Sequence, residues 1–143
     1  MELQFLMLAD AAEVSGGKMF ILGGGWNVFY NNQRQGSHVT MLAAALSLGW
    51  AELGNEHTFV VDLEEAGQRL GQIASGTFSM PKPTGDSFVK HQTFMLAVPI
   101  EVTVKPGSFR VKLVVDGKAL GSVNYSVVDP RVGQFGKGFV GSS

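Results

Sequence analysis

The chain has 143 residues, and charged side chains make up 16% of them, against about 25% in ordinary soluble domains. Its formal net charge of −1 offers no positive footprint for nucleic acid or for an anionic membrane surface, so neither is expected as a partner. Cys is absent, which excludes disulfides, thiolate metal sites and cysteine nucleophiles.

The first predicted elements are two short apolar strands. Residues 4–9 predict the first strand and residues 18–22 the second, with residues 10–17 as the connection. Both strands are apolar on both faces, so each is either covered twice within the chain or lies against a partner subunit. The candidate interface residues in these strands are Phe5, Met7, Met19 and Ile21.

The opening residues differ from a secretory signal. Glu2 stands where a signal peptide carries Lys or Arg, and the apolar run at residues 5–8 is too short. No stretch of the sequence approaches the length of a membrane span. We therefore expect a cytoplasmic chain.

Three glycines at residues 23–25 interrupt the pattern before Trp26, Val28 and Tyr30 continue it.

Residues 39–48 leave two interpretations open. Their run of Ala and Leu favours a helix by propensity, whereas the surrounding β pattern favours a strand, and we favour the strand.

The second half of the chain predicts further strands. Residues 58–63 pair with a strand from 70 to 80, and residues 81–86 form a loop. A strand at 89–100 is interrupted by Pro99, and residues 101–105 add a short edge piece.

The clearest pattern lies in residues 106–128, where apolar and polar side chains alternate on both sides of a Gly-containing turn, which predicts a β-hairpin. We expect Phe59, Val61, Phe109 and Leu113 in the core. Together the elements predict an all-β fold: one antiparallel two-sheet β-sandwich over residues 1–130, immunoglobulin-like or C2-like.

Residues 131–143 form a glycine-rich tail, for which a flexible end is the default interpretation. Phe135 and Phe139 favour another use, as apolar anchors that dock on a neighbouring subunit. They complete the candidate interface.

Catalytic and cofactor motifs are absent from the sequence, so no catalytic residue, metal site or cofactor is expected. The histidines His38, His57 and His91 are widely separated, which favours ordinary strand-edge residues over metal ligands. The acidic residues at 62, 64 and 65 surround one turn and favour a solvated turn over a calcium loop.

The aromatic residues Trp26, Tyr30 and Trp50 permit a flat platform for a sugar or another small ligand, although buried core aromatics are the favoured interpretation. This platform is the basis of the alternative function.

Two blocks of sequence carry a resemblance to a known family. They are the opening, Leu8-Ala9-Asp10-Ala11-Ala12 with Gly17-Lys18-Met19-Phe20-Ile21-Leu22-Gly23-Gly24-Gly25-Trp26, and the closing segment from Pro106 to Gly117. The chain resembles a family of small uncharacterised bacterial proteins that open in this way. The resemblance implies a small single-domain β protein, and it carries over no activity and no ligand residue.

Low charge and doubly apolar strands predict a non-enzymatic protein-interaction or structural module, an oligomer or an accessory component of a larger assembly. The alternative is a small-ligand or carbohydrate-binding sandwich. An enzyme is not expected.

Overall fold

The structure, a computed structural model, describes residues 1–31, 36–84 and 91–133. Over these residues the chain forms nine strands and one short helix. The strands are β1 (Glu2–Ser15), β2 (Lys18–Gly24), β3 (Val28–Tyr30), β4 (Ser37–Gly49), β5 (Glu56–Glu65), β6 (Gln68–Ser79), β7 (His91–Thr103), β8 (Gly107–Val115) and β9 (Lys118–Val128). The helix is α1 (Pro130–Gly133).

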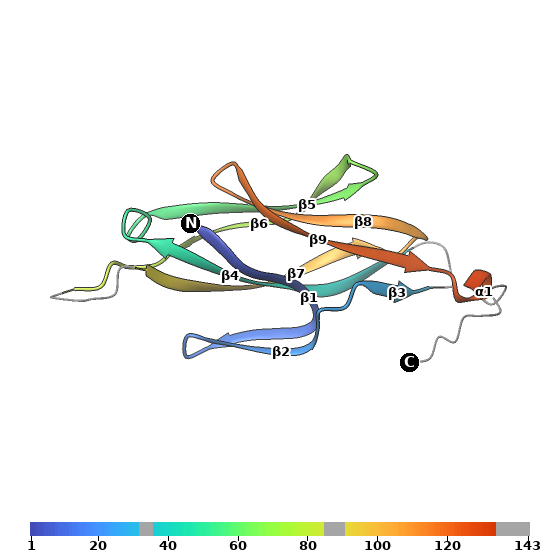
Figure 1. Cartoon of the computed structure of the whole chain (residues 1–143), viewed down its shortest axis with the longest axis horizontal. Helices are drawn as coiled ribbons and strands as arrows, with labels where there is room; N and C mark the ends of the chain where they lie inside the picture. The colour runs from blue at the N-terminus through green and yellow to red at the C-terminus, as the bar shows by residue number, and fades with distance from the viewer. Residues whose placement is uncertain (32–35, 85–90, 134–143) are drawn as a thin grey trace.

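The strands form two sheets that pack face to face (Figure 1). The four-stranded sheet has the order β2-β1-β4-β7, and the five-stranded sheet has the order β3-β9-β8-β5-β6. Every pairing is antiparallel except that of β3 with β9, which is parallel. The predicted all-β, two-sheet sandwich is confirmed.

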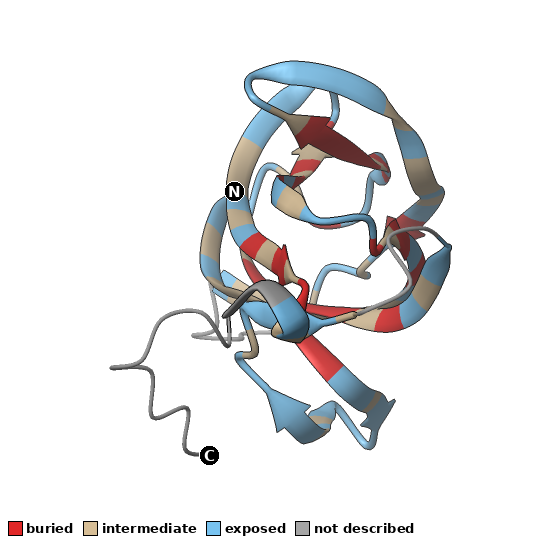
Figure 2. Cartoon of the chain, turned by 90° about the vertical axis from the view of Figure 1, so that its right-hand side faces the viewer, coloured by how far each residue is buried: buried red, intermediate tan, exposed pale blue. Residues whose placement is uncertain are grey.

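The hydrophobic core lies between the two sheets, where Figure 2 shows the buried residues. Alternation along each strand places every second side chain there. Phe59, Val61, Phe109 and Leu113 are each no more than 6% exposed, so the predicted core positions are confirmed. The rings of Phe109 and Tyr125 stack with their centroids 5.2 Å apart.

The hairpin predicted at residues 106–128 is confirmed as β8 and β9. Its two-residue turn has positive φ at both positions, 50° at Asp116 and 79° at Gly117. This conformation suits the right-handed twist of paired strands, and Asp followed by Gly tolerates it better than most residue pairs.

The ambiguous segment at residues 39–48 is a strand, as favoured. Its central position explains its composition, because β4 pairs with β1 on one side and with β7 on the other. Leu42, Ala44 and Leu46 join the core, while Ala43 and Ala45 lie on the opposite face and are still 0% exposed. A strand covered on both faces loses the polar alternation that distinguishes it from a helix.

The predicted connection at residues 10–17 is wrong over most of its length. β1 continues from Glu2 to Ser15, and its second half pairs with β2. Residues 10–13 are small or acidic, so they lack the β-branched and aromatic side chains that indicate a strand. The pairing with β2 holds them extended instead. The turn predicted at residues 15–17 is confirmed.

The predicted break at Pro99 is also wrong. β7 runs through Pro99, and residues 101–103 are its last part, not a separate edge piece. β7 is an edge strand that pairs only with β4 among the described residues. Pro lacks an N–H group, and an edge strand tolerates this loss where the position faces away from its neighbour.

The described part of the chain ends with α1, next to Asp129. The Asp129 carboxylate is buried and accepts hydrogen bonds from the Arg131 backbone N–H at 2.9 Å and from its guanidinium at 3.0 and 3.1 Å. Phe135 and Phe139, the predicted tail anchors, lie outside the described residues. No helix in the described ranges is long and apolar enough to cross a membrane.

Candidate functional site

A two-stranded arm extends from the four-stranded sheet. β1 pairs with β4 as far as Ala9, which lies opposite Met41, and beyond that point it pairs only with β2 among the described residues. We call residues 10–24 the arm. Figure 1 shows it below the two layers, and Figure 2 shows it projecting from the body with most of its residues exposed.

The two faces of the arm are both largely apolar. Cross-strand neighbours share a face, so the register defines two sets of residues. The open face carries Ala11, Glu13, Phe20 and Leu22, and the covered face carries Ala12, Val14, Met19 and Ile21. Phe20 is 59% exposed and Leu22 is 72% exposed, whereas Met19 and Ile21 are half-buried.

The arm bends back over the outer face of the four-stranded sheet. β2 contacts β7 although β1 and β4 separate them in the sheet order. Where the arm leaves the sheet, a Cβ placed on Gly24 would lie 2.7 Å from Ile21 Cγ2 and 2.9 Å from Met7 Sδ. Glycine at this position therefore lets Met7 and Ile21 approach each other.

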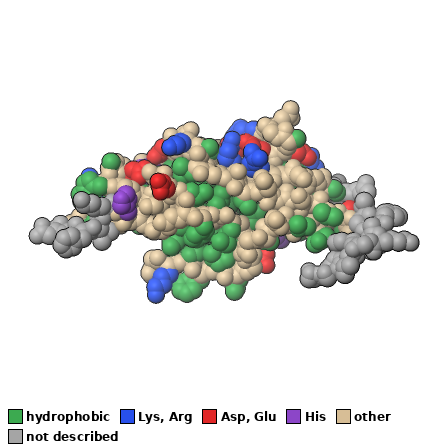
Figure 3. All heavy atoms as spheres, in the orientation of Figure 1, with side chains coloured by type: hydrophobic (Ala, Val, Ile, Leu, Met, Phe, Trp, Pro, Cys, Tyr) green, Lys and Arg blue, Asp and Glu red, His purple; other side chains and the backbone are tan. Residues whose placement is uncertain are grey.

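The sheet face beside the arm is also apolar. Register places Ala45 between Phe5 and Met95, and Ala43 between Met7 and Ala97. The two central alanines, Ala43 and Ala45, are 0% exposed. Figure 3 shows hydrophobic side chains gathering over the lower part of the molecule, with most charged groups above them.

Four of the predicted interface residues thus belong to one region. Phe5 and Met7 lie on the outer sheet face, and Met19 and Ile21 lie on the covered face of the arm. Phe20 and Leu22 belong to the apolar strand predicted at residues 18–22 but not to the candidate interface residues, and they are more exposed than any of these four. The apolar run at residues 19–22 contained the signal, but alternation alone does not show which of its two faces meets solvent.

The arm itself lines a hollow of about 620 Å³. The lining residues are Ala11, Ala12, Glu13, Met19, Phe20, Ile21 and Leu22. Glu13 is the one charged residue among them, so the hollow suits apolar side chains of a partner better than a polar ligand.

The three candidate platform residues do not form one surface. Trp26 is partly buried, donates a hydrogen bond to Thr40 Oγ1 at 3.2 Å, and packs edge-on against Tyr125. Trp50 lies just past the far end of β4, about 30 Å from Thr40 at 3.3 Å per residue. Tyr30 is exposed on β3. Trp26 and Trp50 therefore lie at opposite ends of the sandwich.

This placement predicts how iodide quenches the fluorescence of the two tryptophans. Trp50 is 47% exposed, and the Lys82 ammonium lies 5.1 Å from its ring centroid, where it attracts the anion. Trp50→Phe should therefore remove most of the quenchable emission, while Trp26→Phe should retain it. Equal Stern–Volmer slopes for the two single-tryptophan variants would contradict the placement.

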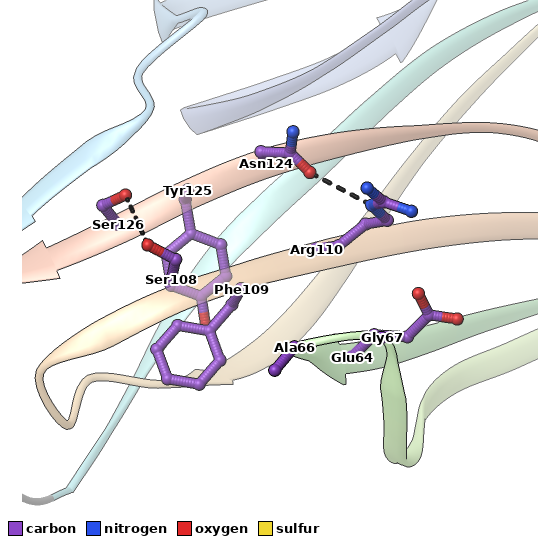
Figure 4. Close-up of a pocket in the computed structure, with 9 residues that line it drawn as sticks. All are labelled: Glu64, Ala66, Gly67, Ser108, Phe109, Arg110, Asn124, Tyr125 and Ser126. Carbon is purple, nitrogen blue, oxygen red and sulfur yellow. Dashed lines mark hydrogen bonds between the residues drawn. The ribbon is translucent and has the colours of Figure 1, made fainter.

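A polar groove of about 360 Å³ lies over β8 and β9, near the tip of the β5–β6 hairpin (Figure 4). Its polar side chains bond to one another: Arg110 Nε donates to Asn124 Oδ1 at 3.2 Å, and the hydroxyls of Ser108 and Ser126 lie 3.3 Å apart. Tyr125 lines the groove. Burial raises the pKa of the Tyr125 hydroxyl, which donates a hydrogen bond to the Thr103 carbonyl at 2.9 Å. The groove can offer hydrogen bonds, but its groups are already paired.

His57 forms a buried clamp between distant segments. Its Nδ1 lies 2.6 Å from Asp116 Oδ2, and its Nε2 lies 2.7 Å from the Glu52 carbonyl oxygen. Both partners only accept, so the ring donates from both nitrogens and is therefore positively charged. Burial opposes this charge, yet the hydrogen bonds to Asp116 and Glu52 outweigh it and raise the pKa of His57. The ring thereby links residue 52 to the turn between β8 and β9.

The acidic residues considered as a calcium loop are paired with cations. Asp62 lies 3.0 Å from Arg69, Glu64 lies 2.7 Å from Lys112, and Glu65 lies 3.1 Å from Lys105. Within the described ranges, no group of three or more His, Asp or Glu side chains is placed to hold a metal ion.

One comparison with known proteins gives a match. The model of DUF6941, a family of unknown function, matches residues 4–128. The chain belongs to this family. No curated protein and no solved structure matches the chain.

Membership in DUF6941 assigns no activity, so the roles of residues rest on geometry. The family match runs from residue 4, within β1, to the end of β9 and therefore includes the whole arm. Of the surfaces described above, the arm and the sheet face beside it join the most exposed apolar side chains to a free strand edge. They form the candidate functional site.

Proposed function

We propose that the protein works through protein contact, as a non-enzymatic subunit or accessory component of a larger assembly, and that the arm makes this contact. One observation carries the proposal. The arm is a two-stranded hairpin with Phe20 and Leu22 exposed on its open face. Two-stranded hairpins are marginally stable in water unless another layer covers them, and the sheet covers only one face of the arm.

The exposed side chains support this proposal in energetic terms. Complete burial of a Leu or Phe side chain contributes about 1.5–3 kcal/mol. Phe20 and Leu22 are each more than half exposed, so a partner that covered both would gain roughly 2–4 kcal/mol from these two residues. Few charges oppose such a contact, because the arm carries only Asp10, Glu13 and Lys18.

A double substitution on the open face tests the proposal. Phe20→Ser with Leu22→Ser should abolish the recovery of associated protein, including untagged copies of this chain, when the tagged full chain is purified from the cells that make it. The physical reason is the lost apolar area. The readout is the set and amount of protein retained with each variant.

Leu70→Ser is the matched control, because Leu70 is 48% exposed on β6 and lies outside the arm. This control should retain the same proteins as the wild type. The free energy of unfolding of each variant should lie within about 0.5 kcal/mol of the wild-type value, since the substituted side chains are exposed. If the arm variant and the control retain the same proteins in the same amounts, the arm is not the contact surface.

A further inference from the structure

The free edge of β2 is unprotected, unlike the other sheet edges in the described part of the chain. Edge strands expose N–H and C=O groups that pair with other strands, and proteins guard them with charges, proline or short length. β7 carries Pro99 and Glu101, β6 carries Arg69, and β3 has only three residues. β2 has seven residues, and its one charge, Lys18, stands at its first position.

We propose that a second copy of this chain covers the arm, with β2 of one copy paired antiparallel to β2 of the other. This inference rests on the proposed function and names the partner of the same surface. It joins the two four-stranded sheets edge to edge into one continuous sheet across a two-fold axis.

The strand's own register specifies the pairing. Directly opposed residues of antiparallel strands share a face, so one residue must lie opposite its own copy, with the two-fold axis midway between them. Pairing Lys18–Gly24 with itself places that axis at Ile21, and Gly23, with a φ of 61°, is the one residue of this segment with a positive φ. Ile21 then lies opposite Ile21 of the partner subunit, at a Cα separation of about 4.5–5.5 Å.

This register makes the open face self-complementary. Phe20 of each copy lies opposite Leu22 of the partner subunit, which is an aromatic–aliphatic pair of the kind that stabilises sheets. Lys18 lies opposite Gly24 of the partner subunit, where no side chain obstructs its aliphatic stem. No like charges are brought together along the paired strands.

The contact between the two copies is small. An aromatic side chain can bury about 150–250 Å², and the exposed parts of Phe20 and Leu22 with the strand edge offer roughly 400–500 Å² on each copy. The total of about 800–1,000 Å² lies below the standard interface of about 1,600 Å². We therefore expect a reversible dimer that forms at roughly 10–100 µM.

A single introduced cysteine tests the geometry, because the chain has none of its own. Ile21→Cys should form a symmetric disulfide when the full chain is treated with diamide at about 100 µM, since opposed Cα atoms lie within the range of about 4.4–6.8 Å that a disulfide requires. Ser75→Cys, at an exposed position on edge strand β6, is the matched control. We expect Ile21→Cys to cross-link at least ten times faster.

A second variant separates specific pairing from random collision. Adding Phe20→Lys to Ile21→Cys places like charges near the axis and should reduce the cross-linking rate to that of Ser75→Cys. Equal rates for the two single-cysteine variants, or an unchanged rate with Phe20→Lys, would overturn the β2-to-β2 pairing. If cross-linking fails while protein recovery still depends on Phe20 and Leu22, the proposed function stands and only the second copy is rejected.

Discussion

Truncation of Phe109 to alanine should lower the free energy of unfolding by about 3–5 kcal/mol. Phe109 is 3% exposed and stacks on Tyr125, so its removal loses both the transfer energy of the ring and its packing contacts. The two residues pair directly between β8 and β9, so the truncation leaves a cavity beside the Tyr125 ring. Urea denaturation followed by circular dichroism measures the change.

Leu70→Ala is the control for this truncation. Leu70 is 48% exposed on β6, so its truncation should change the free energy of unfolding by less than about 1 kcal/mol. A loss below about 1 kcal/mol for Phe109→Ala would show that the ring is not in the core and that the faces of β8 are assigned wrongly.

Loss of the Asp116 carboxylate should destabilise the fold by about 1–3 kcal/mol. Asp116 accepts from the buried His57 ring at 2.6 Å and from the Thr58 backbone N–H at 2.9 Å. Asp116→Ala leaves both donors without this partner and forces alanine into a backbone with φ of 50°. Asp116→Asn retains the turn, since Asn tolerates positive φ, and it removes the charge and one of the two accepting oxygens.

The difference in the free energy of unfolding between the wild type and Asp116→Asn should depend on pH in a defined direction. The pKa of His57 is raised above its ordinary value of 6.5, chiefly by hydrogen bonds that outweigh burial. Hydrogen bonds from His57 and Thr58 lower the pKa of Asp116 below 3.8. The ion pair therefore contributes fully between about pH 4 and 6.5, and its contribution declines as the pH rises through the pKa of folded His57.

Chemical denaturation at several pH values measures this effect. The free energy of unfolding of the wild type should exceed that of Asp116→Asn by about 1 kcal/mol at pH 5.5. This difference should shrink steadily above pH 6.5. Glu101→Gln, at an exposed carboxylate of β7, should stay within about 0.5 kcal/mol of the wild type. A difference that grows with rising pH would show that His57 is not held in its charged form.

Local sequence patterns predicted the sandwich because most strands carry their own signal. In β8, Phe109, Val111, Leu113 and Val115 face the core while polar residues alternate with them, and a turn with Asp116 and Gly117 follows. The alternation and the turn each depend on only a few neighbouring residues, so both can be read without knowing which distant strands pair.

The arm could be predicted only in part. Residues 10–13 lack strand propensity, and their extended conformation depends on pairing with β2 and not on their own side chains. The apolar character of residues 19–22 was visible, but the choice between Phe20 and Ile21 as the more exposed residue depends on how the arm bends over the sheet. That bend is a tertiary property.

The clamp around His57 gave no sequence signal. Its partners come from residue 52 and residue 116, and Asp116 is 59 positions away along the chain. A single histidine near a strand end is compatible with many environments. Only the pairing of β5 with β8 brings the two side chains together.

The native mass of the full chain, measured from about 1 to 200 µM, tests most directly whether the arm joins copies of this protein. The wild type and Leu70→Ser should convert from monomer to dimer as concentration rises, while Phe20→Ser with Leu22→Ser should remain monomeric throughout. Monomers for all three proteins, or the same dimerisation for all three, would contradict dimerisation through the arm.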